Sequence, residues 1–196
     1  QGTAAAKRKL ALSSGKDPKG KSRSPAGIAL SQNGRFLYVA ENLSDTLAVI
    51  DTENGAVVDR ADSGHFPYAV VSAPGGDLFV SAWGGNVVTR FRIDPNTGKI
   101  QGTETLQVGR YPSALLLNSE GSRLFVACGS VDTIAIIDTK KFQLITKLND
   151  AVPGISEGST PNALALSPDQ SKLFVAEADS NAVAVFQLSA SSSGFG

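Results

Sequence analysis

Short apolar runs separated by small polar turns recur along nearly the whole chain. In the first such unit, Asn33 and Gly34 form a hairpin-turn signal between two runs, and the runs cover residues 26–30, 36–40, 46–50 and 56–60. The runs are almost continuously apolar, as is typical of strands covered on both faces, and no amphipathic helical periodicity appears. This pattern predicts four short antiparallel strands, which we call A, B, C and D.

The unit is repeated four times, and each copy begins at a proline. The prolines are Pro25, Pro67, Pro112 and Pro161, at spacings of 42, 45 and 49 residues. Such a period suits four strands with their turns, which is one blade of a β-propeller. We therefore predict an all-β fold, a β-propeller with four blade repeats over residues 25–190, followed by a flexible end at residues 191–196.

The second strand of each copy carries a family resemblance. The segments read YVAE from Tyr38, FVS from Phe79, FVA from Phe125 and FVA from Phe174, each with its upstream proline. Together they resemble the YVTN-type β-propeller repeat. This resemblance implies a seven-bladed ring, a secreted or periplasmic bacterial protein, and in some members an adjacent phosphoesterase-like domain.

The chain departs from that family where strand B ends. The family's asparagine is replaced there by Glu41, Ala82, Cys128 and Glu177. A different residue must therefore fill the polar role of the asparagine in this turn.

The strand count leaves two ways to arrange the blades. Residues 5–12 resemble a lone D strand, and the fourth copy ends after strand C, so the strands sum to sixteen. In one arrangement the chain is part of a seven-bladed ring that needs complementary blades or a second copy of itself. In the other, residues 5–12 close a four-bladed ring. We favour the larger ring, because repeat arrays need neighbours to bury their faces.

Charge is balanced over the whole chain but not along it. Residues 1–24 hold seven basic side chains and one acidic one, and the repeats hold 11 basic and 17 acidic ones. Residues 13–24 are also rich in Ser, Gly and Pro, which indicates a solvated basic loop after the leading strand. No aromatic side chain lies among these charges, so we expect no nucleic-acid binding. The apolar runs are too short to span a bilayer.

Blade topology predicts where a ligand would bind. The D-to-A connections and the B-to-C turns should emerge on one face, around a channel lined by the A strands. The candidate ligand-binding residues on that face are His65, Tyr68, Trp83, Arg110, Tyr111, Glu41 and Glu177. The A-to-B turns on the opposite face are small and polar, so we interpret them as plain hairpin turns.

Motifs for catalysis, metals or cofactors are missing from the sequence, so no catalytic residue, metal ligand or cofactor is predicted. The leading hypothesis is a non-catalytic binding or scaffolding module of a secreted or periplasmic protein. One alternative is a lactonase-type hydrolase, in which His65, Arg110 and acidic turn residues would polarise an ester carbonyl and activate water. A weaker alternative is a redox-partner propeller.

Overall fold

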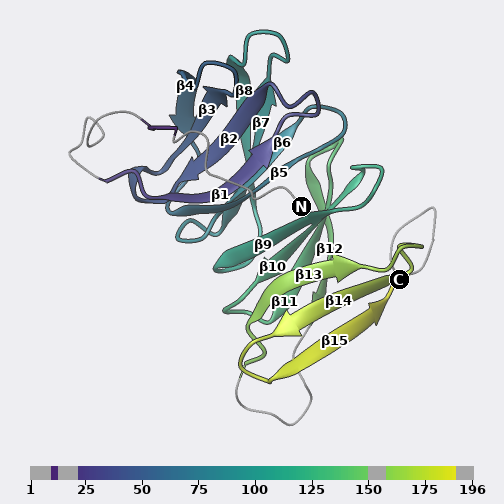
Figure 1. The fold of residues 1–196 in the computed structure, drawn as a ribbon. Helices are drawn as coiled ribbons and strands as arrows, with labels where there is room; N and C mark the ends of the chain where they lie inside the picture. The colour runs from purple at the N-terminus through teal and green to yellow at the C-terminus, as the bar shows by residue number, and fades with distance from the viewer. Residues whose placement is uncertain (1–9, 13–21, 150–157, 189–196) are drawn as a thin grey trace, which may run out of the picture.

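A computed structural model describes residues 10–12, 22–149 and 158–188 of the chain. In these residues the chain forms four antiparallel sheets, three of four strands and one of three, with strands in simple sequence order (Figure 1). The predicted β-propeller architecture is confirmed. Within the described residues no helix is long and apolar enough to cross a membrane.

Each sheet is one blade, and its strands follow the A-to-D order. Blade 1 consists of β1 (Pro25–Leu30), β2 (Phe36–Glu41), β3 (Thr46–Asp51) and β4 (Val57–Asp62), with the short 3-10 helix η1 (Asn42–Ser44) between β2 and β3. Blade 2 consists of β5 (Pro67–Ser72), β6 (Leu78–Ala82), β7 (Val87–Ile93) and β8 (Ile100–Gln107). Blade 3 consists of β9 (Pro112–Leu117), β10 (Arg123–Cys128), β11 (Thr133–Asp138) and β12 (Gln143–Asn149). Blade 4 consists of β13 (Pro161–Leu166), β14 (Lys172–Glu177) and β15 (Ala182–Gln187).

The middle strands of each blade explain the continuous apolar runs. In β6 every residue is buried, and β10 and β11 are buried along most of their length. Each of these strands contacts a neighbouring blade on at least one face, through cores such as that of Phe36, Leu47, Leu78 and Phe91 between blades 1 and 2. Because these strands are covered by blades rather than by water, they do not need to alternate apolar and polar residues.

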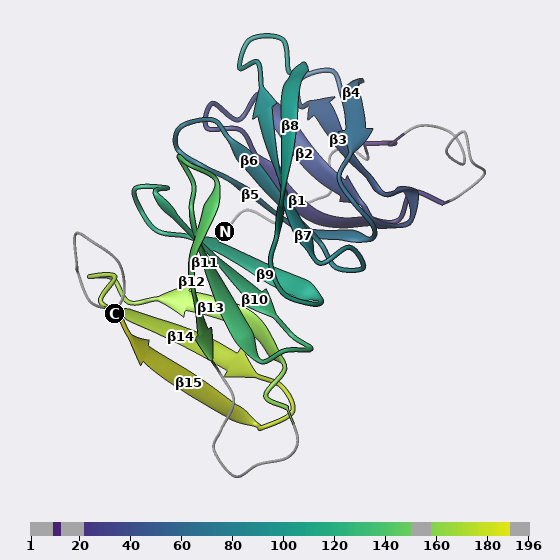
Figure 2. The same cartoon turned by 180° about the vertical axis from the view of Figure 1, so that it is seen from behind.

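The A strands lie innermost and approach one another closely. Strands β1, β5, β9 and β13 are successive neighbours along the arc (Figures 1 and 2). A Cβ atom added to Gly27 on β1 would lie 2.2 Å from the carbonyl oxygen of Tyr68 on β5, so only glycine allows this approach. The A strands thus pack against one another on the inner side of the arc, where blade topology predicts them.

A repeated polar contact joins blade 1 to blade 2 and blade 3 to blade 4, and we call it the clasp. The B-to-C turn of each blade contains one Asp or Asn with positive φ, and these residues are Asp45, Asn86, Asp132 and Asn181. Two of the carboxylates bond the connection into the following blade. Asp45 Oδ1 accepts the backbone N–H of Phe66 at 3.0 Å, and Asp132 Oδ1 accepts those of Ser159 at 2.9 Å and Thr160 at 3.1 Å. The turn thus fixes where the next blade begins.

The residue just before each proline also has positive φ. These residues are Ser24, Phe66, Tyr111 and Thr160, with φ between 45° and 53°. None of them is glycine, and the left-handed region is unfavourable for bulky side chains, so the surrounding contacts must hold them there. The clasp supplies such contacts at Phe66 and Thr160.

The blades form an open arc, not a closed four-bladed ring. Blades 1 and 4 lie at opposite ends of the arc in both views (Figures 1 and 2). Residues 10–12 form no strand, and the carbonyl oxygen of Leu12 accepts a hydrogen bond from Arg60 Nη2 in blade 1, far from β15. The rest of the predicted leading strand, residues 5–9, lies outside the described residues. The open arc agrees with the favoured arrangement, part of a larger propeller.

The clasp at Asp132 gives a direct stability prediction. We expect Asp132→Ala to lower the free energy of unfolding by about 2 kcal/mol, because two backbone N–H groups at the start of blade 4 lose their acceptor. Asp132→Asn keeps a side-chain oxygen and tolerates positive φ, so it should lose less than half as much. Urea unfolding of the three proteins measures both values. Equal losses in the two variants would contradict the assigned role of the side-chain oxygen.

Candidate functional site

The predicted binding face is assembled by hydrogen bonds between its two sets of loops. Backbone N–H groups of the B-to-C turns donate to carbonyl oxygens of the D-to-A connections within each blade. Trp83 donates to Phe66 at 2.9 Å, Gly129 to Tyr111 at 3.2 Å, and Ala178 to Thr160 at 3.2 Å. The two sets of loops therefore share one face, as the topology predicts.

Two adjoining hollows lie on this face at the mouth of the channel. The first has a volume of about 760 Å³ and is lined by Asn42, Leu43, Phe66, Tyr68, Trp83, Ser113 and Asn162. The second, of about 440 Å³, shares Trp83, Ser113 and Asn162 with the first and extends to Tyr111, Gly129, Ser130, Thr160 and Pro161. We call the pair the mouth hollow. Its lining comes from all four blades.

Aromatic rings form its most prominent surface. Trp83 and Tyr111 stack with ring centroids 4.6 Å apart and an interplanar angle of 26°, although they belong to different blades. Tyr68 is 51% exposed and Trp83 41% exposed, values that are high for aromatic side chains. The structure thus brings together three predicted residues, Tyr68, Trp83 and Tyr111, on one surface.

The two predicted basic residues lie beside the mouth hollow rather than in its lining. His65 Nδ1 lies 3.1 Å from Asp45 Oδ1, and its ring stacks on Phe66 at 4.0 Å. His65 therefore helps to hold the clasp. Arg110 is exposed next to Tyr111, and no hydrogen bond or ion pair joins its side chain to another described residue.

The two predicted acids do not reach the surface of the mouth hollow. Glu41 is fully buried and forms ion pairs at 3.0 Å with Arg23 and with Arg60, and it accepts a hydrogen bond from Thr46 at 2.7 Å. Glu177 is also buried, at 4% exposure. Both residues are the last of their B strands, and neither lines the mouth hollow.

Blade topology from the sequence already places Asn42 and Asn162 on this face, although they were not among the seven candidates, whereas Ser113 was not expected there. Ser113 and Asn162 occupy the position directly after the repeat proline, as Tyr68 does in its own blade. That position lines the mouth hollow in three blades, so alignment of the repeats with Tyr68 and Asn162 could have identified Ser113 as well. Asn42 follows Glu41 in η1, and its Nδ2 donates to the Pro67 carbonyl oxygen at 3.0 Å.

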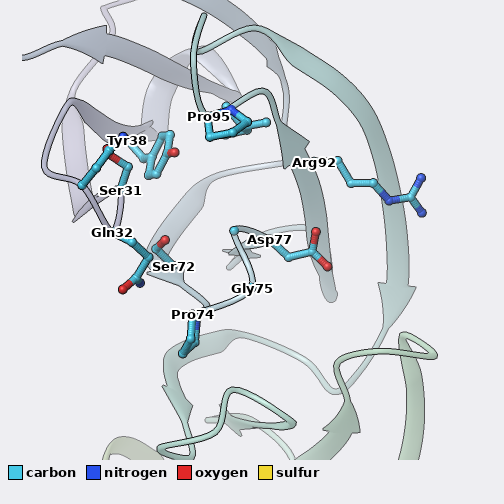
Figure 3. Close-up of a pocket in the computed structure, with 12 residues that line it drawn as sticks. Ser31, Gln32, Tyr38, Ser72, Pro74, Gly75, Asp77, Arg92 and Pro95 are labelled. Atoms are coloured by element: carbon cyan, nitrogen blue, oxygen red, sulfur yellow. The ribbon is translucent and has the colours of Figure 1, made fainter.

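A separate hollow lies on the opposite face, between blades 1 and 2 (Figure 3). It has a volume of about 350 Å³, and its lining includes the A-to-B turn residues Asn33 and Gly75. Tyr38 points toward this space and Arg92 points away from it. Burial raises the pKa of Tyr38, so the hydroxyl stays protonated and able to donate. Two of the A-to-B turns that we interpreted as plain hairpins therefore line a hollow, those of blades 1 and 2. The A-to-B turns of blades 3 and 4, which contain Glu120 and Asp169, are not part of this lining.

In residues 10–12, 22–149 and 158–188, no group of three or more His, Cys, Asp or Glu side chains could hold a metal ion.

Comparison with known proteins supports the β-propeller fold that the geometry shows. Residues 68–155 match the family model described as "Lactonase, 7-bladed beta-propeller". The chain is an arc of a β-propeller. No curated protein sequence matches it significantly.

Solved structures show the same fold at low sequence identity. The periplasmic gluconolactonase of Pseudomonas aeruginosa aligns with a TM-score of 0.70 and 20% identity over 84% of this chain and 53% of its own. Hydrazine synthase of Kuenenia stuttgartiensis aligns with a TM-score of 0.67 and 20% identity, over 86% of this chain and 45% of its own. Virginiamycin B lyase of Staphylococcus aureus aligns with a TM-score of 0.64 and 20% identity, over 88% of this chain and 61% of its own. The β-propeller arc thus spans about half the length of these relatives.

The buried ion pair gives a prediction that separates stability from binding. Glu41→Gln should lower the free energy of unfolding by about 3 kcal/mol, because Arg23 and Arg60 lose their buried counter-charge. Chemical denaturation measures this loss, and Glu120→Gln, in an exposed turn, is the matched control. If Glu41→Gln were as stable as the control, the carboxylate would have no structural role.

Proposed function

We propose that this β-propeller arc is a non-catalytic binding module, and that the mouth hollow binds a neutral ring-shaped ligand of the sugar or sugar-lactone class. The observation that carries this proposal is the lining, in which aromatic rings adjoin amide and hydroxyl side chains and no charged group is present.

The aromatic surface suits a sugar ring. Tyr68, Trp83 and Tyr111 present broad apolar faces with polar edges, and such faces pack against the C–H groups of a sugar. Asn162 and Ser113 supply a side-chain amide and a hydroxyl, which can donate to and accept from sugar hydroxyls. A mainly apolar surface with a few polar groups is the usual composition of a small-molecule site.

The absence of charge in the lining favours a neutral ligand over an anionic one. An anion in this hollow would lose water without gaining a cationic partner, which is unfavourable. The nearest basic groups, His65 and Arg110, lie beside the hollow, and His65 faces Asp45. A neutral sugar needs no cationic partner, so this lining suits it better than it suits an anion.

For the cellular setting, we propose a secreted or periplasmic protein. The support is the YVTN-type resemblance of the repeats together with the fold shared with a periplasmic gluconolactonase. The same resemblance supports an adjacent phosphoesterase-like domain as a partner. Fractionation of the native host, with the chain traced by antibody, tests the compartment.

A second candidate function is hydrolysis of a sugar lactone. The family match over residues 68–155 favours it, since this segment includes Tyr68, Trp83, Arg110 and Tyr111. In this alternative, His65 and Arg110 at the rim would act on the ester carbonyl and on water. Binding and hydrolysis share the ligand class and differ in whether turnover occurs.

Trp83 allows a direct binding test, because it is the only tryptophan of the chain. Titration with glucono-δ-lactone or methyl glucoside should change its fluorescence in a saturable way. Tyr68→Ala should weaken binding by at least about tenfold, because one stacking face is removed. Gln32→Ala, on the opposite face, is the matched control and should bind like the unaltered protein.

Two results would contradict the proposal. If Trp83 fluorescence changes with neither compound, the mouth hollow is not a sugar-binding site. Lactone turnover that is lost in His65→Ala would replace the binding module with the hydrolase.

A further inference from the structure

One aromatic position of the repeat differs between blade 1 and the other blades. Three residues before the end of strand B, blades 2, 3 and 4 carry Phe79, Phe125 and Phe174, whereas blade 1 carries Tyr38. Phe79 and Tyr38 are both buried, at 0% and 4% exposure, so either ring fills this place in a blade. Packing alone therefore does not require the hydroxyl of Tyr38.

The hydroxyl of Tyr38 has no partner among the described residues. No hydrogen bond joins it to another residue of these ranges, and the side chain points into the hollow between blades 1 and 2 (Figure 3). Most buried polar groups are hydrogen-bonded, so a free hydroxyl that faces a cavity is available to a bound molecule. Tyr38 thus offers a hydrogen-bonding group to this hollow.

The hollow lies where two neighbouring turns stay apart. At the other two junctions the A-to-B turns touch. A Cβ atom on Gly121 in blade 3 would lie 2.6 Å from Pro74 Cδ in blade 2. Gln170 in blade 4 donates to Ser119 Oγ at 2.6 Å and accepts the Ser119 backbone N–H at 2.8 Å. Between blades 1 and 2, no hydrogen bond joins residues 31–34 to residues 73–77, all of which the structure describes, and the space between them stays open.

Charged groups around this hollow are paired with one another. Asp77 Oδ2 lies 3.8 Å from Arg90 Nη1, and Arg90 Nη2 lies 2.6 Å from Glu104 Oε2. Arg92 points away from the space and also pairs with Glu104 (Figure 3). Two acids and two bases are thus balanced, so a further charge buried here would lack a counter-charge. This balance favours a neutral ligand.

The free polar groups of the lining suit an amide. Besides Tyr38, the lining includes Gln32 and Ser72, whose side chains form no hydrogen bond with another described residue. Hydroxyl groups can donate and accept, and the carboxamide of Gln32 can donate to and accept from a second amide. A ligand with a carbonyl oxygen and an adjacent N–H therefore finds partners for both.

The apolar part of the lining suits a small ring. Pro74 and Pro95 lie on opposite sides of the space (Figure 3). The volume of about 350 Å³ is near the lower end of the range for small-molecule sites. Because Tyr38 is buried, it presents its hydroxyl and not an exposed ring face against which a sugar could pack. The lining therefore differs in kind from that of the mouth hollow.

We propose that the hollow beside Tyr38 is a second binding site of the arc, and that it takes a small, neutral cyclic amide such as a lactam. Tyr38 donates to the carbonyl oxygen, Gln32 and Ser72 supply acceptors for the amide N–H, and the ring packs between the two prolines. The site lies on the opposite face from the mouth hollow, so it does not rest on the proposed sugar binding.

δ-Valerolactam is the probe, and its binding is followed by backbone amide shifts of the ¹⁵N-labelled full chain. Saturable shifts should centre on Gln32, Gly75 and Asp77. Tyr38→Phe should bind the lactam about fivefold more weakly, because one hydrogen bond is lost. Tyr111→Phe removes a hydroxyl from the mouth hollow instead, so it is the matched control and should keep the affinity for the lactam.

A second probe tests the amide N–H. Cyclohexanone keeps the ring size and the carbonyl oxygen of the lactam but has no N–H group. It should bind the unaltered chain about fivefold more weakly than the lactam does.

Tyr38→Phe should also keep the thermal midpoint of the unaltered chain, since phenylalanine fills this position in three blades. Loss of the fold in this variant would show that the hydroxyl serves the core and would overturn the proposal. Equal affinity of the variant and the unaltered chain for the lactam, equal affinity for cyclohexanone, or no saturable shift around the hollow would overturn it too. Sugar binding is measured separately, by Trp83 fluorescence, so its outcome is independent of these.

Discussion

Two of the three blade junctions in the arc depend on one kind of contact, the clasp between a B-to-C turn and the start of the next blade. Asp45 accepts the backbone N–H of Phe66, and Asp132 accepts those of Ser159 and Thr160. Of these three donors, Phe66 and Thr160 have positive φ. The contact fixes the first residues of the inner strand, and with them the direction of the whole following blade. It also positions Phe66, a residue of the mouth hollow, because the clasp holds that backbone directly. Architecture and binding surface thus rest on the same hydrogen bonds.

Charged groups lie in the interior of blade 1, whereas the lining of the mouth hollow has none. The carboxylate of Glu41 is buried against two arginines, while the mouth hollow is lined by aromatic, amide and hydroxyl groups. An exposed ion pair at the mouth would contribute little stability, since water screens it. A buried pair instead fixes the geometry of its strands, because each partner is costly to leave alone. The surface that remains for a ligand is neutral.

The sequence predicted the fold well, because a blade is a local unit. Turn signals such as Asn33-Gly34 and the runs between them define the strands to within two residues in blade 1. Tyr68, Trp83 and Tyr111 were also placed correctly on one face, since blade topology alone decides this. The inward turn of Glu41 could not be predicted, because it depends on Arg23 and Arg60, which are distant in sequence. The hollow beside Tyr38 likewise arises only where two blades meet.

The central claim is that sugar binding belongs to the mouth hollow and not to the hollow beside Tyr38. Backbone amide shifts in a ¹⁵N-labelled sample, followed during titration with methyl glucoside, test it most directly. The account predicts that the largest changes occur at Asn42, Trp83, Ser113 and Asn162, which line the mouth hollow. Changes centred on Ser31, Gly75 and Asp77, around the opposite hollow, would contradict it.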